Sequence, residues 1–158
     1  MPVLNVEIVS LEPMTVAYTC AFGESPEGQA LKRLREWAEP KGLLDDLDEH
    51  PVFGFNNPSP TPGNNEYGYE FWIRVPSSEA AEGDIEVKDF PGGLYAVTRC
   101  QLAGEPNVFE AWRLLWEWVQ SSEYHWRETH ELEKLMNPSA PEGEIELELY
   151  LPIEESAA

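Results

Sequence analysis

The sequence predicts an α+β domain of two pseudo-symmetric strand-helix-strand-strand modules, forming a curved antiparallel sheet with both helices on one face. A Gly-Glu motif and a proline, followed by apolar residues at helical spacing, occur at residues 23–38 and again at 104–119. Each copy follows an apolar segment and precedes an alternating segment that ends in Pro76 or Pro152. Internal repeats of this kind indicate duplicated structural units. We expect a single domain over residues 1–158, with repeat units of about 1–78 and 79–155.

The first module begins with strand-forming residues 3–10 and 14–22, which we interpret as one strand bent near Pro13. Ser25 is a candidate N-cap with Pro26 in the first turn, and the amphipathic helix that follows should end near Pro40-Lys41-Gly42. Two further strands are expected over 52–55 and 67–75. The segment between them is rich in Asn and Pro, which predicts a long surface loop.

The second module repeats this order. Residues 85–90 and 94–102 predict another bent strand, with the bend at Pro91-Gly92-Gly93. Asn107 can cap a helix whose apolar face runs from Val108 to Val119. Strands over 129–136 and 144–151 should then form a hairpin.

The charge of the chain limits its partners. Thirty acidic and ten basic residues give a formal net charge of -20, which disfavours direct contact with nucleic acid. No stretch is long and apolar enough to cross a membrane, and the N-terminus lacks the basic flank of a signal peptide. We therefore expect a cytoplasmic protein, although the acidity alone is equally consistent with a role in solubility.

Metal and cofactor motifs are missing from the sequence. Cys20 and Cys100 lie in apolar runs and are expected to be small buried thiols rather than a disulfide or a metal pair. His125, His130 and Glu133 do not have the spacing of a zinc site. We expect no cofactor and no bound metal.

The last hairpin carries the strongest candidate site. Side chains alternate along a strand, so Glu146, Glu148 and Tyr150 should point away from the helix-covered core. With a turn centred near Ala140-Pro141, Glu133 would lie nearly opposite Glu148. Paired carboxylates either belong to a solvated acidic face or form a site in which mutual repulsion and burial raise a pKa.

The same alternation in the first module directs Glu70, Trp72 and Arg74 toward a cleft between the modules. Carboxylates beside aromatic walls suit flat, apolar or cationic organic molecules. The predicted ligand-binding residues combine acids with aromatic side chains: Glu148, Glu133, Tyr69, Glu70, Trp72, Tyr95, Trp116 and Tyr150.

The chain resembles the GyrI-like effector-binding family over nearly its whole length. The resemblance lies in Phe90-Pro91-Gly92-Gly93, the Trp112 to Trp118 segment, Asn137-Pro138 and Glu148-Leu149-Tyr150-Leu151-Pro152. It implies a duplicated fold and a cleft between the modules for diverse hydrophobic, often cationic, ligands. Relatives carry this domain behind a helix-turn-helix in transcription regulators or alone. No helix-turn-helix pattern occurs here, so the stand-alone form is expected.

The resemblance leaves three functions open. The leading one is a stand-alone binding protein for a small organic ligand, and a hydrolase is second. Some stand-alone relatives look like hydrolases of cyclopropane-bearing DNA-alkylating natural products, and in that role Glu148 or Glu133 would be the catalytic base. Leu135 stands where many relatives have an aromatic residue, which weakens that transfer. The third is a protein-interaction role with a regulator or DNA gyrase as partner; the oligomeric state is left open.

Overall fold

The computed structural model describes residues 4–102, 104 and 106–155. Val3, from the first predicted strand, and Glu105, from the repeated motif, lie outside the described residues. The chain forms two compact units. We call Pro13–Pro91 the continuous unit, and Met1–Glu12 together with Gly92–Ala158 the discontinuous unit. These units differ from the predicted repeats, because the first strand of the chain belongs with the second helix.

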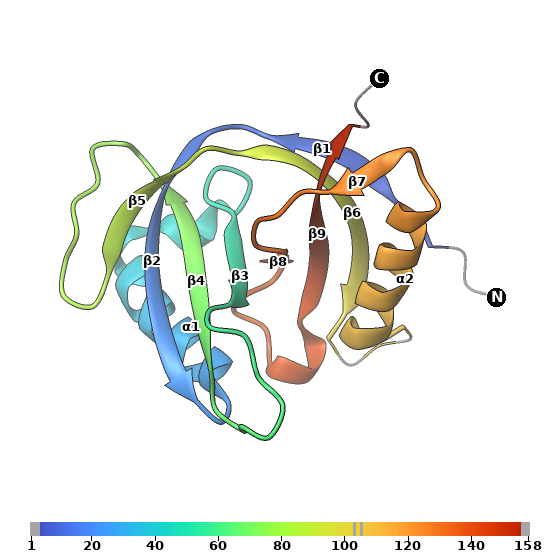
Figure 1. The fold of residues 1–158 in the computed structure, drawn as a ribbon. Coiled ribbons are helices and arrows are strands. Elements are labelled where there is room, and N and C mark those ends of the chain that lie inside the picture. The colour runs from blue at the N-terminus through green and yellow to red at the C-terminus, as the bar shows by residue number, and fades with distance from the viewer. Residues whose placement is uncertain (1–3, 103, 105, 156–158) are drawn as a thin grey trace. The chain divides into compact units, whose positions relative to one another are not determined.

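The continuous unit contains one helix and an antiparallel set of strands (Figure 1). Its elements are β2 (Met14–Gly23), α1 (Pro26–Ala38), β3 (Val52–Asn56), β4 (Tyr67–Val75) and β5 (Glu86–Phe90), with short 3-10 helices at Glu39–Lys41 and Leu43–Asp45. The strands are ordered β3-β4-β2-β5, which places β5 at one end of the set. Helix α1 packs against β2 and β4.

Strand alternation divides this unit into two faces. Ala17, Phe71 and Ile73 are buried on the face that α1 covers. The opposite face carries Tyr18 across from Trp72 and Cys20 across from Glu70. Because Glu70 and Trp72 are buried as well, the second face is also built around a packed cluster.

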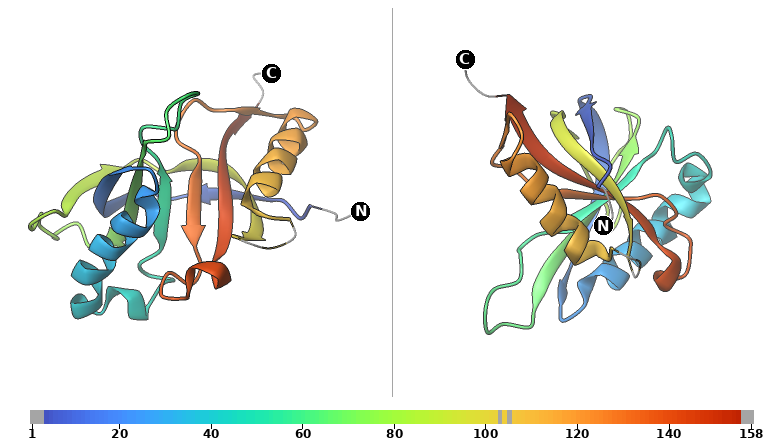
Figure 2. Two further views of the ribbon diagram at one scale, coloured as in Figure 1. Left: turned by 90° about the horizontal axis from the view of Figure 1, so that it is seen from below. Right: turned by 90° about the vertical axis from the view of Figure 1, so that its right-hand side faces the viewer.

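The discontinuous unit has a matching order of elements. It contains β1 (Glu7–Leu11), β6 (Gly93–Gln101), α2 (Val108–Gln120), β7 (Tyr124–Trp126), β8 (Leu132–Leu135) and β9 (Glu146–Glu155), with a 3-10 helix at Glu142–Glu144. The strands are ordered β1-β6-β9-β8, all antiparallel, and β7 pairs with the end of β9. Helix α2 packs against β6, β9 and β7, as Figure 2 shows in orange, yellow and red.

The α+β class and both helices are confirmed. Pro26 occupies the first turn of α1, and the Asn107 side chain accepts a hydrogen bond from the Glu110 backbone at the start of α2. No helix in the described part of the chain is long and apolar enough to cross a membrane.

The two bent strands were predicted wrongly, because each is a pair of separate strands. β1 pairs with β6, whereas β2 pairs with β4 and β5. Proline cannot donate a ladder hydrogen bond, and Gly92 has a φ of +79, so the extended pairing stops at Pro13 and again at Pro91-Gly92. The chain therefore changes unit at each of these breaks.

Candidate ligand-binding site

Glu70 lies at the centre of a buried polar cluster in the continuous unit. Its residue surface is only 2% exposed. Oε1 accepts hydrogen bonds from the Cys20 thiol at 3.3 Å and the Asn57 amide at 3.1 Å. Oε2 accepts from the Trp72 indole at 2.5 Å and the Lys88 ammonium at 2.6 Å. Burial alone would raise the pKa of Glu70, but the bonds from Lys88, Trp72 and Asn57 together outweigh it and lower that pKa.

Aromatic rings surround the Lys88 ammonium. The nitrogen lies 4.0 Å from the centroid of the Tyr18 ring and 5.1 Å from that of Trp72. Tyr18 is itself held by a 2.8 Å hydrogen bond from its hydroxyl to Glu86, and this bond, together with burial, raises the pKa of Tyr18 to about 12. The cluster therefore combines a buried carboxylate, a cation and two ring faces, an arrangement suited to cation–π attraction.

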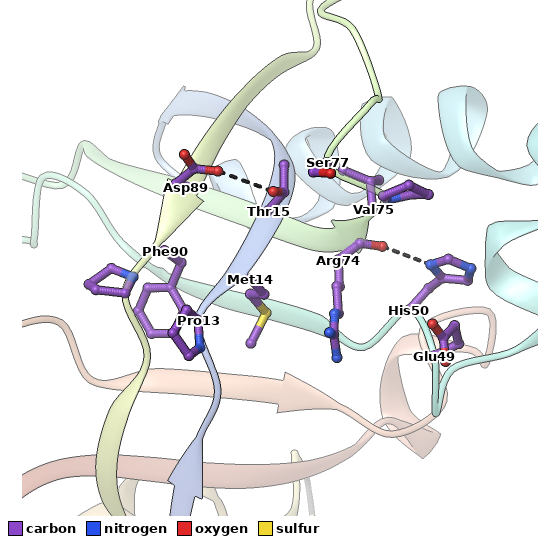
Figure 3. Close-up of a pocket in the computed structure, with 12 residues that line it drawn as sticks. Pro13, Met14, Thr15, Glu49, His50, Arg74, Val75, Ser77, Asp89 and Phe90 are labelled. Carbon is purple, nitrogen blue, oxygen red and sulfur yellow. Dashed lines mark hydrogen bonds between the residues drawn. The ribbon is translucent and has the colours of Figure 1, made fainter.

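A pocket of about 670 Å³ opens beside this cluster, within the continuous unit. Phe90 joins the two, because its ring lines the pocket and lies 4.9 Å from the Trp72 ring. Figure 3 shows Met14 between Phe90 and Arg74. The lining is completed by residues from the strand ends and neighbouring loops: Pro13, Thr15, Glu49, His50, Val75, Pro76, Ser77, Asp89 and Pro91. Its volume falls in the usual range for small-molecule sites.

The polar groups of the pocket differ in how firmly they are held. Asp89 accepts a hydrogen bond from the Thr15 hydroxyl, and the His50 ring bonds the backbone oxygen of Arg74. Arg74 lines the pocket, and Figure 3 shows its side chain beside that of Met14. The Arg74 guanidinium forms no ion pair with any residue that the structure describes. Arg74 is thus available to an acceptor group of a ligand.

A second cluster lies in the discontinuous unit, on the side of the strands away from α2. The Tyr95 and Tyr150 rings meet edge to face at 5.7 Å, and the Tyr150 hydroxyl lies 3.4 Å from Glu148. Burial first, and the Glu148 charge second, raise the pKa of Tyr150. The Lys134 ammonium is 3.9 Å from Glu148, and the Arg127 guanidinium lies over the Tyr95 ring. This face therefore brings together Glu148, Tyr95 and Tyr150, of which alternation predicted Glu148 and Tyr150 to share a face.

The predicted pairing of Glu133 with Glu148 is wrong. Lys134 lies opposite Glu148, whereas Glu133 lies opposite Leu149 on the face covered by α2. There the Glu133 carboxylate accepts a hydrogen bond from the Trp112 indole at 3.1 Å. The loop causes the difference, since the 3-10 helix Glu142–Glu144 shifts the register by one residue, which reverses the face of every side chain on β8.

Two more predicted residues lie apart from these clusters. Tyr69 is buried on the α1 side of β4, with its ring 4.8 Å from that of Phe71, so it does not share a face with Glu70. Trp116 is on α2, where its ring is 5.8 Å from that of Trp126. Their proposed contact with a ligand stays a prediction.

The two cysteines differ more than the sequence suggests. Both are free; Cys100 is buried as expected, but Cys20 is exposed. Cys20 lies opposite Glu70, on the face away from α1, whereas Cys100 lies opposite Leu147, on the face that α2 covers. The two cysteines are therefore on different faces relative to the helix of their own unit. Among the described residues, no group of His, Cys, Asp and Glu could hold a metal ion.

Sequence reasoning missed Lys88 and the pocket. Lys88 lies in the predicted strand 85–90, and its alternation with Phe90 was a usable signal that both side chains share one face. The pocket had no sequence signal, because its lining comes from segments far apart in the chain.

The chain matches one protein-family model over most of its length. A family model described as integron-associated effector binding protein, Cass2, matches residues 7–153. The chain belongs to this family. The Cass2 family is GyrI-like, which confirms the resemblance found in the sequence. Comparison with curated protein sequences gives no match.

Solved structures share the fold at low sequence identity. The C-terminal domain of EcmrR is 14% identical with a TM-score of 0.67, covering 98% of this chain and 100% of that one. In the EcmrR–DNA complex (14% identity, TM-score 0.70), the match covers 96% of this chain and only 58% of the relative. A hydrolase from Listeria innocua is 11% identical with a TM-score of 0.68, over 98% and 94% of the two chains. SAV2435 bound to tetraphenylphosphonium is 14% identical with a TM-score of 0.54, over 96% and 94%.

Proposed function

We propose that this Cass2-family protein binds a small organic effector, with the pocket of the continuous unit as its site. The observation that carries the proposal is a pocket of small-molecule size with an apolar wall and a guanidinium that no described residue pairs with. The family description, effector binding protein, supports it. The cleft expected where the repeats meet stays a prediction.

The pocket favours a ligand with a flat apolar body. Met14 and Phe90 offer contact area, and the Trp72 ring packs behind Phe90. Arg74 can donate hydrogen bonds to an oxygen of the ligand, and a guanidinium does so with fixed geometry. Apolar burial provides most of the affinity in such sites, while a few polar groups set the orientation.

The cluster of the discontinuous unit, whose two tyrosines are buried, is a second candidate site. Tyr95, Tyr150 and Glu148 share one face there, and Glu148 is partly neutralised by Lys134. An aromatic pair beside a carboxylate suits an organic cation, the class to which the tetraphenylphosphonium bound by SAV2435 belongs.

The test uses three probes of one shape: 2-naphthamide, 2-naphthoate and 2-naphthyltrimethylammonium. A ligand that binds only the folded state raises its melting temperature, so thermal shift ranks the probes and calorimetry gives their affinities. We expect Phe90→Ala to weaken binding and Arg74→Met to remove any preference for the carboxylate. The matched control is Phe109→Ala, because Phe109 is 81% exposed on α2. Equal affinities in Phe90→Ala and wild type would refute the assignment of this pocket.

A hydrolase is the second candidate, because a Listeria structure with this fold is described as one. Glu133 and Glu148 lie on opposite faces, so a catalytic base here would be one glutamate acting alone. Glu148 has the Tyr150 hydroxyl and the Lys134 ammonium nearby. Incubation with a cyclopropane-bearing alkylating compound tests this, since ring opening by water adds one water mass and should be lost in Glu148→Gln.

A further inference from the structure

The Glu70 carboxylate has no free acceptor position in this structure. Each oxygen accepts two hydrogen bonds, and three of the four donors are neutral: a thiol, an amide and an indole. Only Lys88 brings positive charge. An ionised carboxylate that is 2% exposed needs such a countercharge, because burying an unpaired charge is strongly unfavourable.

Lys88 lies on the end strand of the unit, apart from the strand that carries Glu70 and Trp72. It comes from β5, which lies at the end of the strand order, and its side chain is 37% exposed. Glu70 and Trp72 are by contrast fixed on β4, with β2 and β3 on either side. The Lys88 ammonium therefore reaches Glu70 from a partly exposed side chain, and Cys20 and Asn57, which also bond Glu70, are exposed as well.

The surroundings of this ammonium are those that recognise alkylated ammonium ions. A carboxylate oxygen lies at 2.6 Å, the Tyr18 ring at 4.0 Å and the Trp72 ring at 5.1 Å. Glu86 holds Tyr18 through its hydroxyl, which keeps that ring in place whether or not a cation lies above it. Ring faces and a carboxylate attract any cation of suitable size, so the lysine side chain has no chemical advantage except its covalent tether.

We infer that Glu70, Tyr18 and Trp72 form an alkylammonium-binding site that Lys88 fills as a built-in ligand. While Lys88 occupies it, this face of the continuous unit excludes free organic cations, so Lys88 determines which ligand class the unit accepts. The pocket adjoins this site through the Trp72–Phe90 contact, and binding of a cation in place of Lys88 does not require an effector against Phe90.

The test is chemical rescue of Lys88→Ala. n-Butylammonium has the four carbons and the ammonium of a whole lysine side chain, of which the alanine variant keeps only Cβ. n-Butanol has the same carbon chain without the charge, and sodium chloride matches the ionic strength. We expect Lys88→Ala to melt below wild type, and n-butylammonium to raise its melting temperature while n-butanol and salt do not. Calorimetry should give an affinity for n-butylammonium at least about tenfold higher than in wild type.

Two control variants make the result specific. In Lys88→Ala/Glu70→Gln, rescue should disappear because the carboxylate is gone. In Lys134→Ala, n-butylammonium should have no effect, since Lys134 lies 3.9 Å from a partly exposed Glu148 and over no ring in the part of the chain described.

Equal responses of wild type and Lys88→Ala would overturn the inference, and so would rescue that survives Glu70→Gln. If Lys88→Ala does not fold in buffer, refolding with n-butylammonium but not with n-butanol supports the site. Failure to refold with either compound overturns it.

Discussion

Trp72 donates its indole hydrogen to Glu70, the residue two positions earlier on the same face of β4. At this spacing the indole N–H and the carboxylate can form a hydrogen bond within one strand, without a loop or a second strand. This bond orients the Trp72 ring so that its face meets the Lys88 ammonium. The same ring also contacts the rings of Phe55 and Phe90. One short segment thus supports both the polar cluster and the wall of the pocket.

Replacing Glu70 with Gln should destabilise the protein most at neutral pH. Because the folded-state pKa of Glu70 lies below its ordinary value of 4.5, the charged carboxylate adds stability above pH 4.5, which is lost as the pH falls through the folded-state pKa. We expect a loss of about 1–3 kcal/mol at pH 7. Urea unfolding at several pH values should show the gap between wild type and variant narrowing below pH 4.5; a constant gap would contradict it.

Cys20 should react slowly despite its exposure. Burial of the sulfur and the adjacent Glu70 carboxylate raise the pKa of the Cys20 thiol to about 11. At pH 8 its alkylation by iodoacetamide should be roughly a hundredfold slower than that of an ordinary thiol. Glu70→Gln should speed the reaction and Lys88→Ala should slow it, since the lysine charge lowers this pKa. Mass spectrometry of the Cys20 peptide measures both rates, and unchanged rates would argue against the thiol–carboxylate contact.

Gly68→Ala should disrupt the support of Glu70. A Cβ at Gly68 would lie 2.0 Å from the backbone oxygen of Asn57, whose side chain bonds Glu70. We expect a loss of about 2–4 kcal/mol from this overlap. Gly28→Ala is the control, because its Cβ would meet nothing within 4 Å and alanine favours a helix. Thermal unfolding measures the stability of both variants. Equal melting temperatures for Gly68→Ala and Gly28→Ala would contradict the close approach of the Asn57 backbone to Gly68.

Glu148 should couple energetically to Lys134 and not to Glu133. Lys134 faces Glu148 across the ladder, whereas Glu133 contacts Trp112 on the other side. In double-mutant cycles, Glu148→Gln with Glu133→Gln should be additive within about 0.5 kcal/mol. The cycle with Lys134→Ala should show a measurable interaction, small because both side chains are partly exposed. Strong coupling between Glu133 and Glu148 would contradict the observed register and favour the pairing of these two residues that the sequence predicted.

Helices and most strands were predictable because local patterns determine them. The Pro26 and Asn107 starts, the apolar stripes and the alternation over 67–75 all lie within single segments. The pairing of β8 with β9 could not be predicted, because the three residues of the 3-10 helix Glu142–Glu144 change which side chains lie opposite each other. Asn137 fixes that loop by bonding the Glu144 oxygen and the Glu146 nitrogen, a contact that no periodicity reports.

The candidate site was predictable to the extent that alternation could define it. Glu70 with Trp72, and Glu148 with Tyr150, do share faces. Lys88 was overlooked because an isolated lysine on an edge strand usually points to solvent. The contacts of Lys88 are with Tyr18 on β2 and with Glu70 and Trp72 on β4. These residues come together only through the pairing of the strands, which the sequence does not show.

The breaks at Pro13 and Pro91 have a consequence for synthesis on the ribosome. Residues 13–91 can close their own hydrogen-bond ladder as soon as β5 has emerged, since every strand of that unit is then present. β1 is made first, yet its partner β6 begins only at Gly93. The hydrogen-bonding groups of β1 therefore stay unpaired while the continuous unit is completed. Slowing translation after residue 91 should prolong the time for which β1 can bind chaperones or pair with a wrong strand.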